Sequence, residues 1–305
     1  PIMSYRTIDG ERCLQRYKKG TCTRCETICP QEAIRPPHID PERCDDCGLC
    51  TAVCPMGAIR TQIDYETELT RIQEMEEPML QCTKASSSGF PCLGVLTRHI
   101  LWELGMRREL RIACAPCHSC RPAVAKWLSQ EITACNEVLS LCGKSSVLCV
   151  QAGDVKKEQT VSRRSFFRAL LQTVGQEVEA VAKREAGTVY SFFPKHWLAQ
   201  HGEHLPTASR ILLSGIEVTN SCDGCRLCEK LCPHNALHFD LSEGESILTF
   251  RAERCTSCGL CAGNCPQQAL TLCSCFDGRR TFTIKKNVKA ETTCAEENHF
   301  FMQRG

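Results

Sequence analysis

Residues 222–266 contain the run Cys222-x2-Cys225-x2-Cys228-x3-Cys232-Pro233, followed by Cys255-x2-Cys258-x2-Cys261-x3-Cys265-Pro266. Each run places three thiols within seven residues. A loop this tight can wrap one compact metal group, but the fourth ligand must come from elsewhere in the chain. Because the same spacing occurs twice and each run ends in Cys-Pro, the pattern indicates two related metal centres.

This segment resembles the bacterial ferredoxins with two [4Fe-4S] clusters, in which the fourth Cys of each motif binds the other motif's cluster. The resemblance implies that one cluster is held by Cys222, Cys225, Cys228 and Cys265. It implies that the second is held by Cys255, Cys258, Cys261 and Cys232. Structural zinc is an alternative for isolated Cys-x2-Cys steps, but it does not explain the paired Cys-x2-Cys-x2-Cys-x3-Cys-Pro runs.

Residues 13–55 repeat the pattern with one irregular spacer. The regular motif is Cys44-x2-Cys47-x2-Cys50-x3-Cys54-Pro55, and its partner is Cys13-x8-Cys22-x2-Cys25-x3-Cys29-Pro30. The same resemblance implies two further [4Fe-4S] clusters, held by Cys13, Cys22, Cys25 and Cys54 and by Cys44, Cys47, Cys50 and Cys29. The long spacer leaves an alternative for Cys13, in which this ligand is lost and the site holds a [3Fe-4S] cluster or uses another residue.

The composition agrees with metal ligation in a reducing compartment. The chain has 27 cysteines in 305 residues, too many residues for a small disulfide scaffold. Its formal net charge is +2, but four clusters with their thiolates would bring the holoprotein to about −6. We therefore expect no nucleic-acid partner. No apolar run reaches the ~20 residues of a membrane span, and Pro1 begins no signal sequence, so we expect a cytoplasmic protein.

Residues 79–151 have a different character. Apolar strand-like segments at 79–82, 110–113 and 146–150 alternate with helical patterns, the second of them over 122–141. This alternation predicts a small parallel β-α-β-α-β domain. Cys82 and Cys114 follow two of these strands, at the edge of the sheet where parallel α/β folds place their sites.

Over about 40 residues, this region resembles the iron-sulfur delta subunit of methyl-viologen-reducing hydrogenases, which passes electrons to heterodisulfide reductase. That family carries a [2Fe-2S] cluster, so the resemblance implies a fifth cluster held by Cys82, Cys92, Cys114 and Cys117, with Cys120 as a substitute. The alternative is a domain whose thiols are reduced and hold no cluster. Cys135, Cys142 and Cys149 have no ligand spacing, and we expect them to pack in the core.

The chain is therefore expected to have an α+β fold with two ferredoxin-like dicluster modules around the small parallel domain and a helical spacer. The spacer is predicted because apolar residues from Phe166 to Val181 fall on one helical face. After Asp277-Gly278, the segment 281–284 is expected to return as a hairpin strand. The expected parts are 1–60 (N-terminal dicluster module), 61–78 (connector), 79–151 (α/β domain), 152–216 (helical spacer), 217–275 (C-terminal dicluster module) and 276–305 (hairpin and tail).

No nucleophile-base pair, dinucleotide fingerprint or P-loop is recognisable in the sequence. We expect an electron-transfer polyferredoxin that relays single electrons through four [4Fe-4S] clusters as a subunit of a larger anaerobic oxidoreductase. Its catalytic partner would be a molybdenum or tungsten enzyme, a hydrogenase or a flavoprotein. Two alternatives remain open: a flavin- or thiol-linked oxidoreductase in its own right, and an iron-sulfur sensor of redox state or oxygen.

Overall fold

The computed structural model describes residues 6–17, 22–84, 89–150, 189–195, 206–242 and 245–284. The apolar face expected from Phe166 to Val181, and most of the expected helical spacer, lie outside these ranges, as does the expected tail after residue 284. Within the described ranges, none of the helices is both long and apolar enough to cross a membrane.

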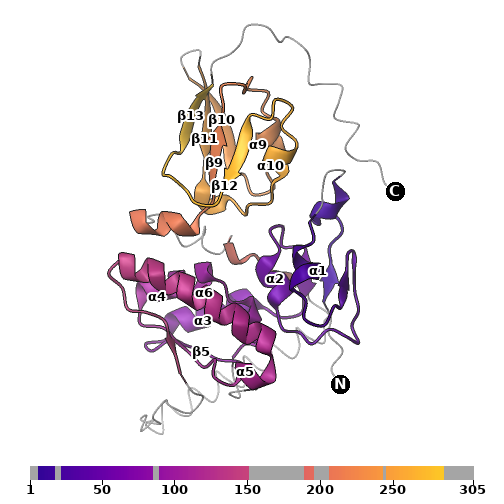
Figure 1. Cartoon of the computed structure of the whole chain (residues 1–305), viewed down its shortest axis with the longest axis vertical. Helices are drawn as coiled ribbons and strands as arrows, with labels where there is room; N and C mark the ends of the chain where they lie inside the picture. Colours follow the sequence, from indigo (N-terminus) through magenta and orange to yellow (C-terminus); the bar gives the residue numbers. More distant parts are fainter. Residues whose placement is uncertain are drawn as a thin grey trace.

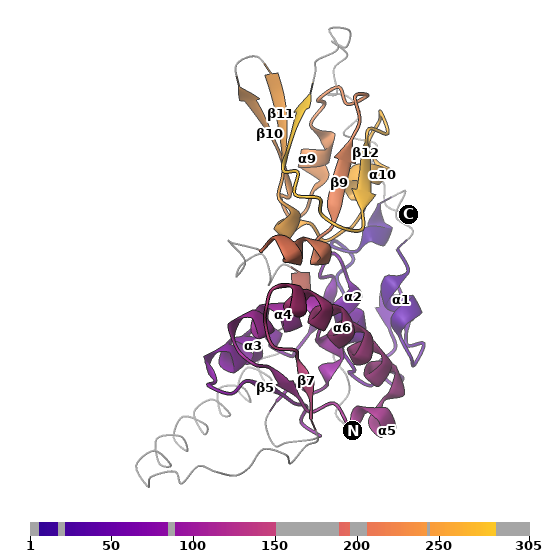
Figure 2. The ribbon, with the colours of Figure 1, turned by 60° about the vertical axis from the view of Figure 1, so that its left-hand side comes forward.

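Three parts of the chain lie around a common centre (Figure 1). The C-terminal module, coloured orange to yellow, lies above the middle domain, and the N-terminal module lies beside both. The turned view keeps this arrangement and shows β10 and β11 side by side in the C-terminal module (Figure 2).

The N-terminal module consists of short elements because its chain turns at every cysteine motif. One antiparallel sheet has the strand order β1-β4-β8, and a separate hairpin pairs β2 with β3. Strand β8 comes from the segment expected to be helical spacer, and pairs Tyr190 with Thr61. The elements are β1 (Thr7–Ile8), η1 (Leu14–Arg16), α1 (Arg24–Ile28), β2 (Ile34–Arg35), β3 (His38–Ile39), α2 (Leu49–Val53), β4 (Ile59–Thr61) and β8 (Tyr190–Ser191).

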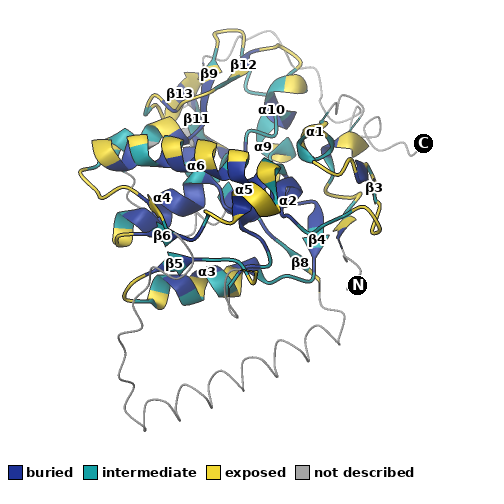
Figure 3. Cartoon of the chain, turned by 60° about the horizontal axis from the view of Figure 1, so that its bottom comes forward, coloured by how far each residue is buried: buried dark blue, intermediate teal, exposed yellow. Residues whose placement is uncertain are grey.

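The middle domain confirms the expected parallel β-α-β-α-β unit. Its sheet has the order β5-β6-β7 with both pairs parallel, and Arg111 is in register with Met79 on one side and Leu148 on the other. Helix α4 is almost entirely buried, whereas α6 keeps an exposed face (Figure 3). The elements are α3 (Tyr65–Glu74), β5 (Met79–Leu80), η2 (Leu93–Val95), α4 (Arg98–Arg107), β6 (Arg111–Ile112), α5 (Cys117–Cys120), α6 (Pro122–Leu141) and β7 (Leu148–Cys149).

The C-terminal module has two small sheets on either side of its cysteine loops. Strands begin at Leu237 and Leu270, at the same place after each Cys-Pro. The elements are η3 (Thr207–Leu212), β9 (Gly215–Val218), α9 (Leu227–Leu231), β10 (Leu237–Ser242), β11 (Glu245–Phe250), η4 (Ala252–Arg254), α10 (Leu260–Gly263), β12 (Leu270–Cys273) and β13 (Thr281–Ile284).

The hairpin expected around Asp277-Gly278 is wrong. Strand β12 pairs with β9, and β13 pairs with β11 in the other sheet. The turn therefore carries the chain from one sheet to the next, and β13 buries Phe282 and Ile284 against the β10-β11 pair. Burial of these two side chains favours the pairing of β13 with β11 over a local hairpin with β12.

One hydrophobic cluster joins the three parts. It includes Leu49 of the N-terminal module, Leu93 and Leu139 of the middle domain, and Leu213 and Phe250 of the C-terminal module. Shared burial of this kind holds the parts in fixed positions, since separating them would expose apolar surface to water.

The N-terminal module and the middle domain approach each other at two glycines. Gly48 has a φ of +86°, and a Cβ there would lie 3.0 Å from the Val95 nitrogen. A Cβ on Gly94 would overlap with the carbonyl oxygen of Cys47. Backbone therefore packs on backbone at this contact, which leaves no room for a side chain.

We expect Gly94→Ala to destabilise the assembled protein by about 1–3 kcal/mol, because the added methyl group overpacks a contact between two backbones. The control is Gly10→Ala, since a Cβ at Gly10 meets nothing within 4 Å. Thermal unfolding of the iron-loaded protein without oxygen would measure both variants. Equal midpoints for the two variants would contradict the backbone contact.

Candidate metal centres

The C-terminal module gathers its eight motif thiols into two quartets. Each quartet lines its own cavity and takes one thiol from the other motif. Quartet A is Cys222, Cys225, Cys228 and Cys265. Quartet B is Cys255, Cys258, Cys261 and Cys232.

The N-terminal module repeats this arrangement. Quartet D, which consists of Cys44, Cys47, Cys50 and Cys29, lines a third cavity. Quartet C is Cys13, Cys22, Cys25 and Cys54. Cys13, Cys22 and Cys54 pack around the same buried side chains. Their charges influence the pKa of Cys25, and the charge of Cys13 also influences the pKa of Cys54. The four thiols are therefore neighbours despite the irregular spacer. Residues 18–21 of the spacer lie outside the described ranges.

The loops reach around the cavities because they use left-handed backbone conformations. Gly48 and Gly259 precede the third thiol of their motifs by two residues, with φ of +86° and +85°. Arg226 takes the same place in the third regular motif with φ of +63°. This conformation costs a non-glycine residue on the order of 1 kcal/mol. Hydrogen bonds from Arg226 to Glu229 Oε2 (2.9 Å) and to the Phe239 carbonyl (3.3 Å) help to offset that cost.

The fourth thiol of each motif is held by the same turn in all four copies of Cys-Pro-x-x-Ala. The third residue after each Cys is left-handed, with φ between +46° and +56°, and the alanine that follows is buried. The alanine amide donates to the Cys sulfur in Ala33→Cys29 (3.4 Å), Ala58→Cys54 (3.3 Å), Ala236→Cys232 (3.2 Å) and Ala269→Cys265 (3.3 Å). An amide donor stabilises a thiolate, so these turns suit sulfurs that carry negative charge.

Burial makes the metal-free quartets costly to ionise. It raises the pKa of Cys25 and Cys228 to about 12. For Cys261, burial together with Cys258, Cys255 and Cys232 raises the pKa still further. Thiolates in these positions need a compensating cation, as bound iron would provide. No three His, Cys, Asp or Glu side chains of the described ranges form a group that could hold a single metal ion. The donor set, the crossed quartets and the amide-sulfur bonds fit [4Fe-4S] clusters, and these clusters supply one-electron redox chemistry when bound.

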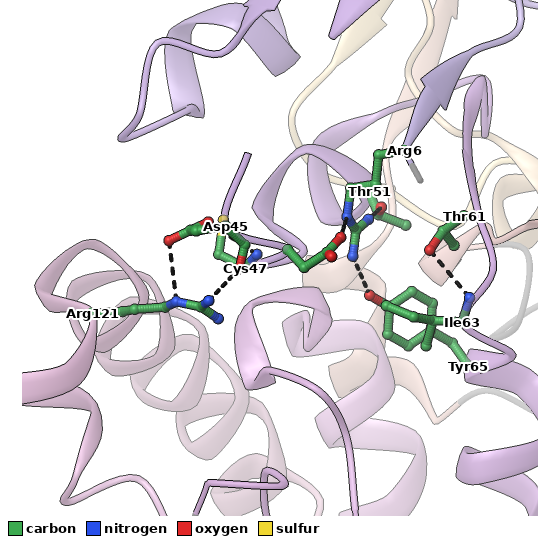
Figure 4. A network of polar contacts seen from close by, with 9 residues as sticks. Arg6, Asp45, Cys47, Thr51, Thr61, Ile63, Tyr65 and Arg121 are labelled. Atoms are coloured by element: carbon green, nitrogen blue, oxygen red, sulfur yellow. Dashed lines mark hydrogen bonds and ion pairs between the residues drawn. The ribbon is translucent and has the colours of Figure 1, made fainter. Parts of the chain in front are cut away.

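A buried arginine, Arg6, stabilises the loop of quartet D through hydrogen bonds (Figure 4). Arg6 donates to Asp46 Oδ1, Thr51 Oγ1 and Tyr65 Oη, each at 2.7 Å. Burial opposes the charge of Arg6, but Tyr65, Cys50 and Asp46 outweigh it and hold its pKa well above the usual value. Sequence reasoning missed Arg6 and Tyr65, because nothing in the local pattern relates residues 59 positions apart.

The middle domain brings four of its five candidate thiols together. Burial and then its neighbours Cys92, Cys82 and Cys120 raise the pKa of Cys117 to about 11. Cys120 accepts a hydrogen bond from Lys84 Nζ at 3.3 Å. We call Cys82, Cys92, Cys117 and Cys120 the middle thiol group.

Cys114 and Cys149 form a separate pair at the ends of β6 and β7. The Cys114 thiol donates to the Cys149 sulfur, which lowers the pKa of Cys149 to about 7 and raises that of Cys114. Cys114 remains close to Cys117. The expectation that Cys149 packs in the core is wrong, because both residues of β7 are exposed at the edge of the sheet. Cys135 is fully buried, as expected.

Arg121 connects the middle thiol group to quartet D. Its Nε lies 3.1 Å from Asp45 Oδ2, and its Nη2 donates to the Asp45 carbonyl (Figure 4). Burial lowers the pKa of Arg121, but hydrogen bonding to Cys92 and the charges of Cys92, Asp45 and Cys47 outweigh this and raise it. Arg121 thus contacts Cys92 of the middle thiol group and Asp45 in the loop of quartet D.

A second contact connects quartets B and C. Leu14 and Leu260 are buried together, and Cys22, Cys54 and Cys258 pack against them. Hydrogen bonds join the same surfaces, from Arg24 Nη2 to the Ser257 carbonyl (3.0 Å) and between His234 Nε2 and the Pro55 carbonyl (3.2 Å). Within the C-terminal module, Cys228 of quartet A lies near Cys261 of quartet B. Within the N-terminal module, Cys25 of quartet C lies near Cys50 of quartet D. The quartets therefore follow one another in the order A, B, C, D.

Two family models match parts of the chain. A 4Fe-4S dicluster domain matches residues 221–269, and a 4Fe-4S binding domain matches residues 36–59. No match to a curated protein was found. The N-terminal and C-terminal parts are thus ferredoxin-type modules that carry [4Fe-4S] clusters. The match to residues 36–59 does not reach Cys13, Cys22, Cys25 or Cys29, and neither match reaches the middle domain. The ligand roles of these thiols and the delta-subunit resemblance therefore stay predictions.

The crossed assignment makes a prediction about iron content. In a variant in which Cys255, Cys258 and Cys261 are serine, quartet B is already lost. Adding Cys232→Ser should then remove no further iron, whereas adding Cys265→Ser should remove up to about four irons from quartet A. Iron quantification after anaerobic purification would measure the iron lost in each variant. The reverse pattern would contradict the exchange of the fourth thiol between the two motifs.

We expect Arg6→Met to destabilise the protein by about 3 kcal/mol, because it leaves the buried hydroxyls of Thr51 and Tyr65 without their charged partner. Arg43→Met is the control, since Arg43 pairs with Glu32 at 3.7 Å on the surface and should contribute less than about 1 kcal/mol. Anaerobic thermal unfolding, followed through the cluster absorbance, would measure both. Similar losses would show that the buried arginine has no special role.

Proposed function

We propose that this chain is an electron-transfer polyferredoxin whose quartets A, B, C and D each hold one [4Fe-4S] cluster. The observation that carries the proposal is the continuous succession of the quartets through the two modules and the contact between them. Electron tunnelling weakens steeply with distance, so one-electron sites placed in succession function as a relay. The ferredoxin-type modules support the electron-transfer role independently of that order.

The middle thiol group would extend the relay by one site. Arg121 lies between this group and quartet D, and Cys82, Cys92 and Cys117 with either Cys120 or Cys114 could hold a fifth iron-sulfur cluster. The hydrogen bond between Cys114 and Cys149 favours Cys120 as the fourth ligand, since Cys114 already has a thiol partner. Electrons would then enter or leave at either end, at quartet A or in the middle domain.

The protein would serve as a subunit of a larger oxidoreductase in a reducing cytoplasm without oxygen. None of the cysteines in the described ranges forms a disulfide, which suits a compartment that keeps thiols reduced. The negative charge of the clusters, about −2 each with their thiolates, would direct docking to a basic surface of a molybdenum or tungsten enzyme, a hydrogenase or a flavoprotein.

Protein purified without oxygen should contain about 16 irons and as many sulfides per chain if quartets A to D are filled and the middle thiol group is empty. A fifth cluster would raise the iron content to about 18–20. Stepwise addition of a one-electron reductant should reduce the clusters in successive steps. Colourless protein, or protein loaded with zinc, would refute the relay.

A further inference from the structure

A cavity of about 460 Å³ lies where the three parts of the chain meet. We call it the junction cavity. Its walls come from α1 and α2 of the N-terminal module, from α4 and α6 of the middle domain, from residues 193–195 and from Thr256 of the C-terminal module. Its volume is in the range of small-molecule sites, roughly 300–1,000 Å³, and it is separate from the cavities lined by the thiol quartets A, B and D.

The junction cavity touches two of the quartets. Cys54 of quartet C lines it directly. Thr256, which also lines it, is the neighbour of Cys255 in quartet B. The charge of Cys255 also influences the pKa of Lys195 in the cavity wall. A molecule bound here would therefore lie between two one-electron sites.

Buried polar atoms without partners belong to residues of this cavity's wall. Among the described residues, five buried side-chain polar atoms have no partner within hydrogen-bond distance, and two of them, Thr97 Oγ1 and His99 Nδ1, belong to residues of the cavity wall. A third, Thr256 Oγ1, lies against the Cys258 sulfur of quartet B. Thr97 and His99 are only 4% and 8% exposed. An unmade hydrogen bond at a buried polar atom is unfavourable, so a ligand with matching polar groups would remove this cost.

His99 identifies one ligand group that would complement the cavity wall. Its Nε2 lies 2.9 Å from the Leu212 carbonyl, which can only accept, so Nε2 carries the hydrogen. Burial and then Lys195 lower the pKa of His99 to about 3, so the ring is neutral. Nδ1 is therefore an acceptor, and it would be satisfied by an N–H or O–H group.

Two cations in the cavity wall favour the opposite kind of ligand group, a hydrogen-bond acceptor. Lys195 Nζ donates to Ser257 Oγ at 3.2 Å, and Arg24 Nη2 donates to the Ser257 carbonyl at 3.0 Å. Both of these partners are neutral, whereas Arg98 is paired with Glu131 at 2.6 Å. Lys195 and Arg24 thus favour an electron-rich oxygen on the ligand. Trp127 and Phe193 in the wall favour a flat ring.

We propose that the junction cavity binds a planar conjugated carbonyl compound, of the quinone or isoalloxazine kind, that exchanges electrons with quartets B and C. The electron exchange rests on the proposed function, whereas the binding rests on the cavity alone. Two reduced clusters each lose one electron, the ring gains both electrons together with two protons from water, and no bond to the protein forms. The oxidised ring offers carbonyl oxygens to Lys195 and Arg24, and the reduced ring offers an N–H or O–H to His99 Nδ1.

The binding experiment uses the holoprotein without oxygen and three probes. A naphthoquinone sulfonate and FMN carry the carbonyl chemistry in its two forms, and the matching naphthalene sulfonate has the ring and charge but no carbonyl. We expect one of the carbonyl probes to bind at one molecule per chain, at least tenfold more tightly than naphthalene sulfonate, by isothermal titration calorimetry. Preference for naphthoquinone sulfonate or for FMN identifies which kind of ring the cavity takes.

Two variants test the site. Lys195→Gln should weaken binding of the preferred probe about tenfold, whereas Lys144→Gln, on an exposed residue, should not change it. Thr97→Val should raise the thermal midpoint of the unliganded protein and also weaken binding, because it removes an unpaired hydroxyl that the ligand would use. A purely structural role for Thr97 would not produce both changes.

The proposal is overturned if no probe binds, if naphthalene sulfonate binds as tightly as the carbonyl probes, or if Lys195→Gln and Thr97→Val leave the affinity unchanged. Failure of binding in protein with the full iron content would remove the cavity proposal and leave the relay. Mixing reduced holoprotein with the bound probe should restore the oxidised cluster absorbance, with two electrons lost per probe. Binding without this change would overturn the electron exchange.

Discussion

The structure depends on the exchange of one thiol between neighbouring cysteine motifs. Cys265 completes quartet A and Cys232 completes quartet B, so neither loop can form its site until the other is in place. Cys54 and Cys29 have the same relation in the N-terminal module. A small module with short strands and helices has little core of its own, and such modules commonly take their stability from metal ligation.

The exchanged thiol is placed by backbone geometry more than by side-chain packing. In all four Cys-Pro-x-x-Ala turns, a left-handed residue turns the chain so that the alanine amide reaches the Cys sulfur. The alanines are 1–3% exposed, which leaves little room for a larger side chain. Since hydrogen bonds to sulfur influence the reduction potential of a cluster, the same turn that builds each site also affects its redox properties.

The contacts between the three parts have consequences that no part would have alone. The shared hydrophobic cluster and the close approach at Gly94 set the middle domain against the loop of quartet D. The packing around Leu14 and Leu260 sets quartet C beside quartet B. Together these contacts bring the thiol groups into succession and form the walls of the junction cavity, where Thr97 and His99 keep unpaired polar atoms. An apolar filling would avoid that cost, so these polar atoms are the strongest sign that the cavity takes a ligand.

The sequence by itself determined the local features of this protein. Spacing of the cysteines, together with the resemblance to two-cluster ferredoxins, predicted which thiols lie together, and alternation of apolar segments predicted the parallel sheet of the middle domain. The signal for each of these predictions lies in short stretches of sequence, a cysteine motif or an apolar run. Tertiary structure alone decided the pairing of β13 with β11, the exposure of Cys149 beside Cys114, the ties made by Arg6 and Arg121, and the junction cavity. Each of these joins residues far apart in the sequence, and such contacts depend on how whole elements pack, which no local pattern records.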